Sequence, residues 1–448
     1  MWADGGAWVG LRRVLGGAAG VLRDAAPLMV AELLPSVAWL TDIGFVSPLG
    51  EAAAAAVGAG GYANWLLAVA LNLFYTGLMV VVGQAWGSGR RGLAARAAGE
   101  TLAAALVLAV LLAAVGYAAA PLLASLLAGD PGVAGPAAGY IRARLLGLPG
   151  LAALLVYDAA LRGTGAGREI LLGNAAAAAA NILLDPVLIY GAGLGVRGAG
   201  YATAASNYAG ALVLAAYTAR RLGPPLPRPP GRLAARVSSV GLPAMVERLA
   251  FAAGHGVYLA SVARCGAAAL AAHSVGVRVE SLAFLPSWAL STYASSVVAQ
   301  EVGAGRLGEA ERRGWETVKA GAVFMTFMGA VLAALSPLAS LLAPAGEARR
   351  LTVLYLLLAA ASEPALGVAM VAAGAIRGAG DTRTPTLVNL ASLYLLRVAP
   401  SALLAGRLGG DACPIAAWLL MDLDTAARAA ALAALYRRRF HRLARRVV

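Results

Sequence analysis

The sequence predicts an all-α membrane protein with twelve transmembrane helices in two six-helix lobes related by pseudo-two-fold symmetry. Three observations lead to this prediction: an apolar composition, twelve apolar runs, and an internal repeat. Of the 448 residues, 60% are hydrophobic and only 13% are charged, whereas soluble proteins average ~25% charged residues. A span needs ~20 mostly apolar residues. Twelve spans therefore leave room for short connectors and exclude a soluble domain of ordinary size.

Apolar runs separated by glycine, proline and arginine position the twelve spans, with boundaries good to about two to four residues. The spans cover residues 25–46, 58–83, 95–127, 135–160, 168–190, 197–219, 237–263, 268–298, 315–342, 349–375, 384–405 and 412–435. The stretch Arg221–Arg232 lies at the middle of the chain. Its prolines cannot continue a helix, so we expect an extended linker there.

This layout predicts five parts. The lobes cover 25–220 and 237–435, joined by a cytoplasmic linker over 221–236 and followed by a basic tail over 436–448. Residues 1–24 lack an uninterrupted apolar core with a cleavage site, so we do not interpret them as a cleaved signal peptide. We expect an amphipathic helix at the membrane interface instead.

Basic residues concentrate on one side of this layout. Most of the 36 Lys and Arg fall at the two ends of the chain or in loops after even-numbered spans. The positive-inside rule then predicts a multi-pass plasma-membrane protein with both termini in the cytoplasm. The net charge of +14 lies in short clusters without interleaved aromatic residues. That pattern suits anionic lipid headgroups and argues against nucleic acid as a partner.

The two halves match each other at an offset of 216 residues. With one residue of slippage, Arg162–Arg168 falls on Arg377–Arg383. The other matches in register include Gln84, Gly87, Gly89 and Arg90 on Gln300, Gly303, Gly305 and Arg306, and Pro27 on Pro243. Six spans per half is an even number, so both halves enter the membrane in the same sense. Parallel repeats of this kind are typical of secondary transporters.

These motifs resemble the multidrug and toxic compound extrusion (MATE) family of transporters. The resemblance covers residues 25 to 435 and is carried by VVGQAWGSGRRGLA, its counterpart VVAQEVGAGRLGEA, and RGAGDTRTP. It implies a monomeric exporter of small amphipathic, often cationic compounds, driven by inward flow of H⁺ or Na⁺. No enzymatic activity and no cofactor besides the coupling ion are expected. The resemblance does not identify the substrate.

Acidic residues inside the predicted spans are the strongest candidates for ion coupling, because a charge at the bilayer centre costs at least ~2.5–3.5 kcal/mol. Asp42, Asp158 and Asp185 lie in spans 1, 4 and 5, and Asn181 shares a helix face with Asp185. At the repeat offsets they fall on Tyr258, Ala373, Pro400 and Leu396. Because these polar groups occur in the first half alone, we favour a functional role over structural pairing.

The resemblance supports the same choice. Archaeal members of the family carry a cation-responsive site at the positions of Asp42, Asn181, Asp185 and Thr203, and asparagine at the position of Asp158. Coupled carboxylates holding a proton and Na⁺ bound by the oxygens of Asp42, Asn181, Asp185 and Thr203 both remain open. Neutralising the site would let span 1 repack by bending at Pro27 or Pro35, where backbone hydrogen bonds are missing.

Weaker candidates lie in the second half. Glu247, Glu280 and Glu363 are in predicted spans 7, 8 and 10. Pairing of Glu247 and Glu280 with the nearby Arg248 and Arg278 is the structural alternative.

Two further patterns bear on competing functions. Asp422 and Asp424 have the Asp–x–Asp spacing of metal-dependent transferases, but no second acidic cluster accompanies them. A lipid or lipid-linked oligosaccharide flippase of the same superfamily is the alternative function. A flippase of large polar headgroups would need a cationic cleft, whereas the cleft candidates here are mostly acids. Cys265 and Cys413 both fall near the predicted outer face, where they could pair.

Overall fold

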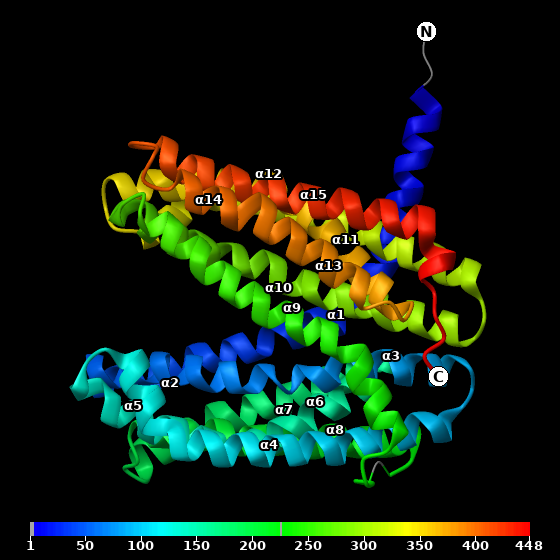
Figure 1. Ribbon diagram of the computed structural model, residues 1–448, viewed down its shortest axis with the longest axis horizontal. Helices are drawn as coiled ribbons and strands as arrows, with labels where there is room; N and C mark the ends of the chain where they lie inside the picture. The colour runs from blue at the N-terminus through cyan, green and yellow to red at the C-terminus, as the bar shows by residue number, and fades with distance from the viewer. Residues whose placement is uncertain (1–3, 225) are drawn as a thin grey trace. The chain divides into compact units, whose positions relative to one another are not determined.

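The computed structural model describes residues 4–224 and 226–448, with side chains in the first helix from Gly16 onward. Within these residues every regular element is a helix (Figure 1). In chain order they are α1 (Asp4–Val46), η1 (Ser47–Leu49), α2 (Glu51–Val69), α3 (Asn72–Gly87), α4 (Arg91–Ala128), α5 (Pro131–Leu145), α6 (Leu148–Gly163), α7 (Gly167–Pro186), η2 (Val187–Gly191), α8 (Val196–Leu222), α9 (Arg232–Ala263), α10 (Ala267–Gly303), α11 (Leu307–Ala339), η3 (Ser340–Leu342), α12 (Glu347–Gly378), α13 (Arg383–Ser392), η4 (Leu393–Val398), α14 (Ala399–Leu404) and α15 (Ala412–Leu443).

The described helices group into the twelve predicted spans once short breaks are joined. Helix α2 continues into α3, α5 into α6, α7 into η2, and α13 through η4 into α14. Eight helical segments are long and apolar enough to cross a membrane, or nine if α5 and α6, bent by 48°, count as one span. A helix satisfies its own backbone hydrogen bonds, as the interior of a bilayer requires.

Helix α1 differs from the expected division at residue 24. It runs without a break from Asp4 to Val46, through both Pro27 and Pro35. The apolar part of α1 and the short turn η1 together cover Gly16–Leu49, which is long enough to span a membrane. The predicted amphipathic face of residues 1–24 depends mostly on side chains before Gly16, which lie outside the described side chains. The interfacial position of this segment stays a prediction.

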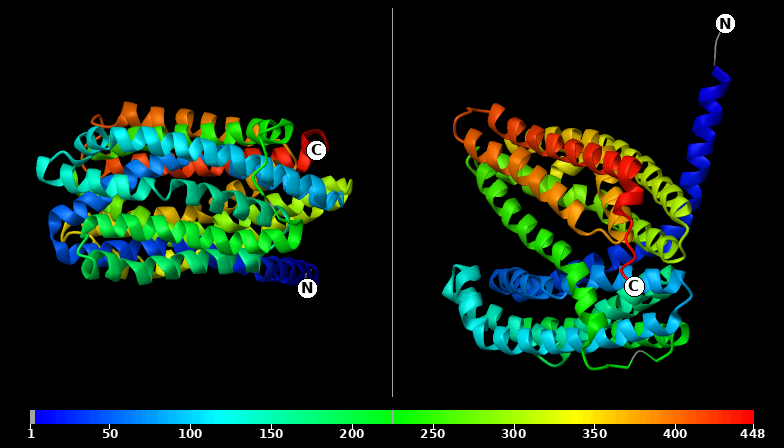
Figure 2. Two further views of the ribbon diagram at one scale, coloured as in Figure 1. Left: turned by 90° about the horizontal axis from the view of Figure 1, so that it is seen from below. Right: turned by 45° about the vertical axis from the view of Figure 1, so that its right-hand side comes forward.

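The chain forms two compact units. The first-half unit comprises Val30–Met245 with Val447–Val448, and the second-half unit comprises the chain up to Met29 with Val246–Arg446. Two of the three boundaries fall inside helices, in α1 and in α9, the third lies after α15, and none lies in the proline-rich linker. In each unit the long helices lie alongside one another (Figures 1 and 2).

Close helix crossings in the first-half unit depend on glycine. A Cβ atom on Gly77 of α3 would lie 2.0 Å from the carbonyl oxygen of Val237 in α9. A Cβ atom on Gly241 of α9 would lie 1.9 Å from the carbonyl oxygen of Leu73. Small residues allow such backbone contact in membrane helices. The sequence therefore selects glycine at both sides of the crossing.

The proline-rich linker is held against the first-half unit. The amide of Arg228 donates a hydrogen bond to the carbonyl oxygen of Gly99, at 3.1 Å. The carboxylate of Glu100 accepts from the amides of Leu233 and Ala234 at the start of α9, at 3.1 and 3.3 Å. A carboxylate at this place satisfies amides that have no partner within the helix.

The second-half unit uses the same packing at equivalent positions of the repeat. A Cβ atom on Gly378 of α12 would lie 2.3 Å from the carbonyl oxygen of Ser295 in α10. In the first half, a Cβ on Gly163 of α6 would lie 2.9 Å from the carbonyl oxygen of Met79 in α3. Gly163 and Met79 are the repeat counterparts of Gly378 and Ser295. The repeat is thus a repeat of helix contacts as well as of sequence.

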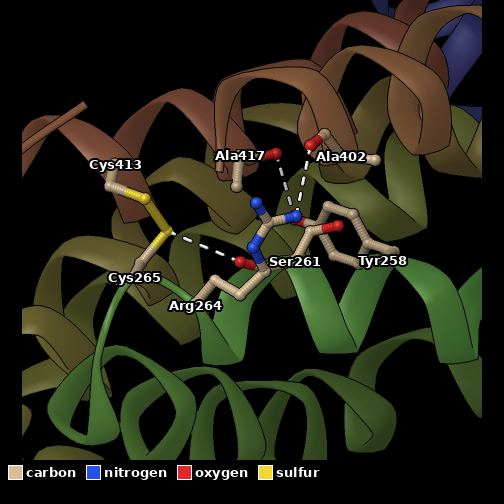
Figure 3. The surroundings of a disulfide bond; sticks show 7 residues. All are labelled: Tyr258, Ser261, Arg264, Cys265, Ala402, Cys413 and Ala417. Atoms are coloured by element: carbon tan, nitrogen blue, oxygen red, sulfur yellow. Dashed lines mark hydrogen bonds between the residues drawn. A yellow bond between two sulfur atoms is a disulfide. The ribbon is translucent and has the colours of Figure 1, made fainter. Parts of the chain in front are cut away.

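A disulfide joins Cys265, between α9 and α10, to Cys413 at the start of α15, with their Cα atoms 5.5 Å apart (Figure 3). Two hydrogen bonds lie beside it. The Tyr258 hydroxyl donates to the carbonyl oxygen of Ala417 at 3.0 Å, and the Arg264 guanidinium donates to that of Ala402 at 3.5 Å. A disulfide is typical of an oxidising compartment, in agreement with the outer position that the basic residues predict.

Reduction of this disulfide should destabilise the protein. The bond joins residues that are 148 positions apart in the sequence. In the chain-entropy treatment, closing so long a loop in the unfolded chain stabilises the folded protein by about 5 kcal/mol. We expect a lower thermal unfolding midpoint in detergent after reduction, and two alkylatable thiols that appear only then. Cys265→Ser is the control, because its midpoint should not respond to reductant. Equal midpoints for the oxidised and reduced wild type would contradict this prediction.

Valine at Gly378 should disrupt the α10–α12 crossing, because its Cβ would meet backbone that cannot move aside. We expect a loss of about 3 kcal/mol or more, seen as aggregation in size-exclusion chromatography or a lower unfolding midpoint. Gly58→Val in α2 is the matched control, since no heavy atom lies within 4 Å of the added Cβ. Similar behaviour of the two variants would argue against the packing account.

Candidate functional site

Four predicted polar residues come together in the first-half unit; we call them the Asp42 group. Asp42 is on α1, Asn181 and Asp185 are on α7, and Thr203 is on α8. The Thr203 hydroxyl lies 3.2 Å from an Asp42 carboxylate oxygen and donates to it. Asp42 also interacts electrostatically with Asp185 and Asn181. Asp42, Asn181 and Asp185 are buried.

Several polar atoms of the Asp42 group have no hydrogen-bond partner in the described structure. They are Asp42 Oδ1, both carboxylate oxygens of Asp185, and both amide atoms of Asn181. Buried polar atoms in proteins are nearly always paired, and two neighbouring buried carboxylates repel each other. Oxygen-rich clusters of this kind suit hard cations. The arrangement can therefore take up a proton or a small cation.

Arg144 is a charged neighbour that the sequence analysis did not select. It interacts electrostatically with Asp42, and its guanidinium donates to the Tyr140 hydroxyl at 3.0 Å. Both residues are on α5. The signal available in the sequence was the position of Arg144 inside the predicted span 135–160, where an arginine needs a nearby partner.

Asp185 lies at the end of α7, where the helix geometry changes. Pro186 follows directly and has no amide hydrogen, and the helix then widens into the π-helical turn η2. The Tyr190 hydroxyl in η2 donates to the carbonyl oxygen of Phe45 near the end of α1. This bond ties the two helices that carry Asp42 and Asp185.

Asp158 does not belong to the Asp42 group, although the sequence analysis placed it among the coupling candidates. Its carboxylate lies 2.6 Å from the Arg162 guanidinium and accepts from the Tyr75 hydroxyl at 2.8 Å and from the Asn174 amide at 3.4 Å. Arg162 also contacts Glu32, at 3.0 Å. The extra carboxylate is therefore paired with a buried cation.

In the second-half unit, Glu247 is paired through a different arginine from the expected one. Its carboxylate receives two contacts of 2.8 Å from Arg377, and further hydrogen bonds of 2.8 Å from Thr386 and Asn389. Arg248 lies over the Trp288 ring, 4.7 Å from its centroid. Adjacent residues on a helix point in different directions, so the sequence neighbour was the wrong partner.

Glu280 and Glu363 lie in a second acidic group, which includes Asp422. Glu363 is fully buried, neither of its carboxylate oxygens has a hydrogen-bond partner, and it interacts electrostatically with Glu280 and Asp422. Glu280 accepts from the Tyr355 hydroxyl and not from Arg278. No second acidic cluster accompanies Asp422 in the sequence, because Glu280 and Glu363 are brought near it only by the packing of distant helices.

The two acids of the Asp–x–Asp pattern have different surroundings. Asp424 contacts the guanidinium groups of Arg397 and Arg428 at 2.8 and 2.9 Å, whereas Asp422 lies near Glu280 and Glu363. Among the described residues, no three His, Cys, Asp or Glu side chains are positioned to hold a metal ion.

Comparison with protein-family models finds a match to the family described as MatE, over residues 27–187 and 243–403. The starts of the two matched segments are separated by the offset of the internal repeat. A probable multidrug resistance protein NorM from Thermotoga maritima is 26% identical over 395 residues, covering 84% of this chain and 83% of the relative. A relative named as an FAD transporter, from Shewanella oneidensis, is 30% identical over 275 residues, covering 59% and 61%.

Solved structures share the fold. A MATE crystal structure in the straight conformation superposes with a TM-score of 0.86 at 19% identity, covering 95% of this chain and 97% of the other. A transporter of the MOP superfamily from Pyrococcus furiosus superposes with a TM-score of 0.85 at 19% identity, covering 96% and 97%. The predicted twelve-helix, two-lobe fold is thereby confirmed.

Neutralising Asp158 and Asp185 should have different effects on stability. Asp158→Asn removes one of the carboxylates that the buried Arg162 contacts, and we expect the free energy of unfolding to fall by about 3 kcal/mol. Asp185→Asn removes an unpaired carboxylate beside Asp42, so we expect an equal or higher unfolding midpoint in detergent at neutral pH, as is common where function requires unfavourable groups. The same loss of stability in both variants would show that Asp185 is a structural partner too.

Proposed function

Because this chain belongs to the MATE family of membrane transporters, we propose that it exports small amphipathic, often cationic compounds in exchange for H⁺ or Na⁺. In this proposal the coupling ion binds at the Asp42 group. The single observation that carries it is the pair of buried carboxylates, Asp42 and Asp185, with oxygens that have no hydrogen-bond partner. Relatives named as multidrug resistance proteins support small compounds as substrates.

Neutralisation is the physical step that couples ion and cargo. A proton on one carboxylate, or Na⁺ held by the oxygens of Asp42, Asn181, Asp185 and Thr203, removes the repulsion between two buried charges. Helix α1 can then repack, with Pro27 and Pro35 as points where backbone hydrogen bonds are missing. Each elementary charge that enters through ~100 mV supplies about 2.3 kcal/mol. That energy drives export of the cargo against its concentration gradient.

Glu280 and Glu363, with Asp422 beside them, are the second-half candidates for binding a cation or a cationic cargo. Glu363 supports this assignment, since it is a fully buried carboxylate with no hydrogen-bond partner. Glu247 is the weakest of the second-half candidates, because four hydrogen bonds already occupy its carboxylate. We propose further that the protein acts as a monomer in the plasma membrane, with both termini in the cytoplasm.

The alternative function is a flippase of lipids or lipid-linked oligosaccharides. The observation in its favour is the pair of buried arginines, Arg397 and Arg428, which share the single carboxylate of Asp424. Such a surplus of positive charge would suit a phosphate-bearing cargo. The surplus of buried acids in the Asp42 group and around Glu363 favours the cation exporter.

Loss of the Asp42 carboxylate should abolish ion-driven efflux. We would measure efflux of an ethidium-like cation from proteoliposomes under a pH gradient or a Na⁺ gradient, imposed separately. Asp42→Asn and Asp185→Asn should insert normally, yet their flux should fall to that of protein-free vesicles. Asp24→Asn is the control, because this acid is on the same helix with a side chain that is 58% exposed.

Either gradient that supports flux in the wild type identifies the coupling ion. Wild-type efflux in both Asp variants would contradict ion coupling at the Asp42 group. If the wild type transports nothing under either gradient, transfer of a fluorescent lipid between leaflets becomes the decisive measurement, and activity there would support the flippase.

A further inference from the structure

A buried ion-pair network holds α1 to the helices that carry the rest of the coupling site. Arg162 of α6 is 4% exposed and contacts Glu32 of α1 at 3.0 Å and Asp158 at 2.6 Å. Its guanidinium also lies over the Tyr75 ring, 6.0 Å from the centroid. Asn174 of α7 donates to Asp158 at 3.4 Å. Arg162 of α6 thus contacts side chains of α1 and α3, and Asp158, its partner on α6, extends the network to α7.

This network and the Asp42 group join α1 to α7 at two heights. Glu32 and Asp42 are ten residues apart on α1, which is about 15 Å along a helix. Asn174 and Asp185 are eleven residues apart on α7, or about 16 Å. The two spacings are similar, so the chain of contacts from Glu32 through Arg162 and Asp158 to Asn174 lies at about the same distance along both helices from the Asp42 group.

We propose that the Glu32–Arg162 ion pair is a positioning contact for the coupling ion. It holds α1 at the height where the carboxylates of Asp42 and Asp185 are forced together, and so raises the affinity of the site for a proton or Na⁺. The inference rests on the proposed ion coupling at the Asp42 group. Asp158 acts through the same arginine, because it keeps Arg162 in place between α6 and α1.

The place of Glu32 on α1 supports this role. Helix α1 passes from the second-half unit to the first-half unit between Met29 and Val30, so Glu32 is within the first turn that belongs to the first-half unit. Pro35 follows and cannot donate a backbone hydrogen bond to Ala31. The ion pair of Glu32 lies three residues before this weak point, so it holds the part of α1 from which the segment that carries Asp42 continues.

The second half carries a similar contact, displaced by one residue on its first helix, without the acid pair. Arg377 is the repeat counterpart of Arg162, and it binds Glu247 on α9. Glu32 and Glu247 stand five and four residues after the matched prolines, Pro27 and Pro243. An arginine that holds the first helix of each lobe is therefore part of the repeated scaffold, while the Asp42 group is an addition that depends on it in the first half.

The test compares two glutamates of the first-half unit. Glu32→Gln removes the charge that Arg162 contacts on α1. Glu169→Gln is the matched control: Glu169 joins α7 to α8 through Arg221, at 2.6 Å, and the two glutamate side chains are equally exposed, at 22%. The measurement is the half-saturation of cation efflux with the coupling ion, in proteoliposomes.

We expect Glu32→Gln to weaken the apparent ion affinity roughly fivefold or more, within the usual range of coupling between sites. For protons this is a fall of about 0.7 in the pH midpoint of transport, because more acid is needed to fill the site. Glu169→Gln should keep the wild-type value. Maximal flux at saturating ion should be retained in both, since neither residue contacts the ion.

A thiol variant tests the charge directly. No free cysteine is present among the described residues, so Glu32→Cys introduces one reactive group. Modification with a carboxyethyl methanethiosulfonate should restore the ion affinity, because the adduct is anionic. The aminoethyl reagent gives a cationic adduct and should not restore it. Equal restoration by the two reagents would show that side-chain bulk, and not the ion pair, matters.

Two results would overturn this inference and leave the proposed function standing. One is a wild-type ion affinity in Glu32→Gln, and the other is an equal loss of ion affinity in Glu169→Gln, in both cases with Asp42→Asn inactive. A wild type without any ion-dependent flux would instead refute the proposed function, and this inference with it. The Asp42→Asn variant therefore separates the two failures.

Discussion

The need to neutralise charge inside an apolar environment governs the polar interior of this protein. A buried ion is expensive unless a counter-charge and hydrogen bonds accompany it. Asp158, Glu247 and Asp424 meet this requirement, because each contacts a buried or partly buried arginine. Asp185 and Glu363 do not, since neither oxygen of either carboxylate has a hydrogen-bond partner among the described residues, and Asp42 meets it in part, because Thr203 donates to one oxygen while the other has no partner there. The first set joins side chains of different parts of the chain, and the second set contains the residues that we propose as binding sites.

The internal repeat separates scaffold from site on independent grounds. Gly163 and Gly378 occupy equivalent positions in the two halves and make equivalent close approaches, and the arginines before them, Arg162 and Arg377, each bind a glutamate on the first helix of their half. At the repeat position of Asp42 the second half has Tyr258, and Arg397 lies over that ring at 5.7 Å. Matched positions of the repeat thus carry a buried acidic group in one half and an aromatic–cationic contact in the other.

Helix α1 combines several features that are not found together in any other described helix. It belongs to both compact units, it contains two prolines, and it carries both Glu32 and Asp42. Under the proposed ion coupling, the Glu32–Arg162 ion pair holds one part of this helix, and occupancy of the Asp42 group shifts the position of the other part.

The sequence by itself determined the fold class, the twelve spans, the repeat, the family, and the group formed by Asp42, Asn181, Asp185 and Thr203. The fold class, the spans and the repeat follow from hydropathy and from spacing along a helix, which depend on local order in the chain. The grouping of Asp42 with Asn181, Asp185 and Thr203 is what the resemblance to the family implied. Only the tertiary structure decided that Asp158 pairs with Arg162, that Glu247 pairs with Arg377 in place of Arg248, that Asp422 stands beside Glu363, and that Cys265 bonds to Cys413. Periodicity shows which face of a helix a residue occupies, but the partner of a buried charge depends on which distant helix meets that face.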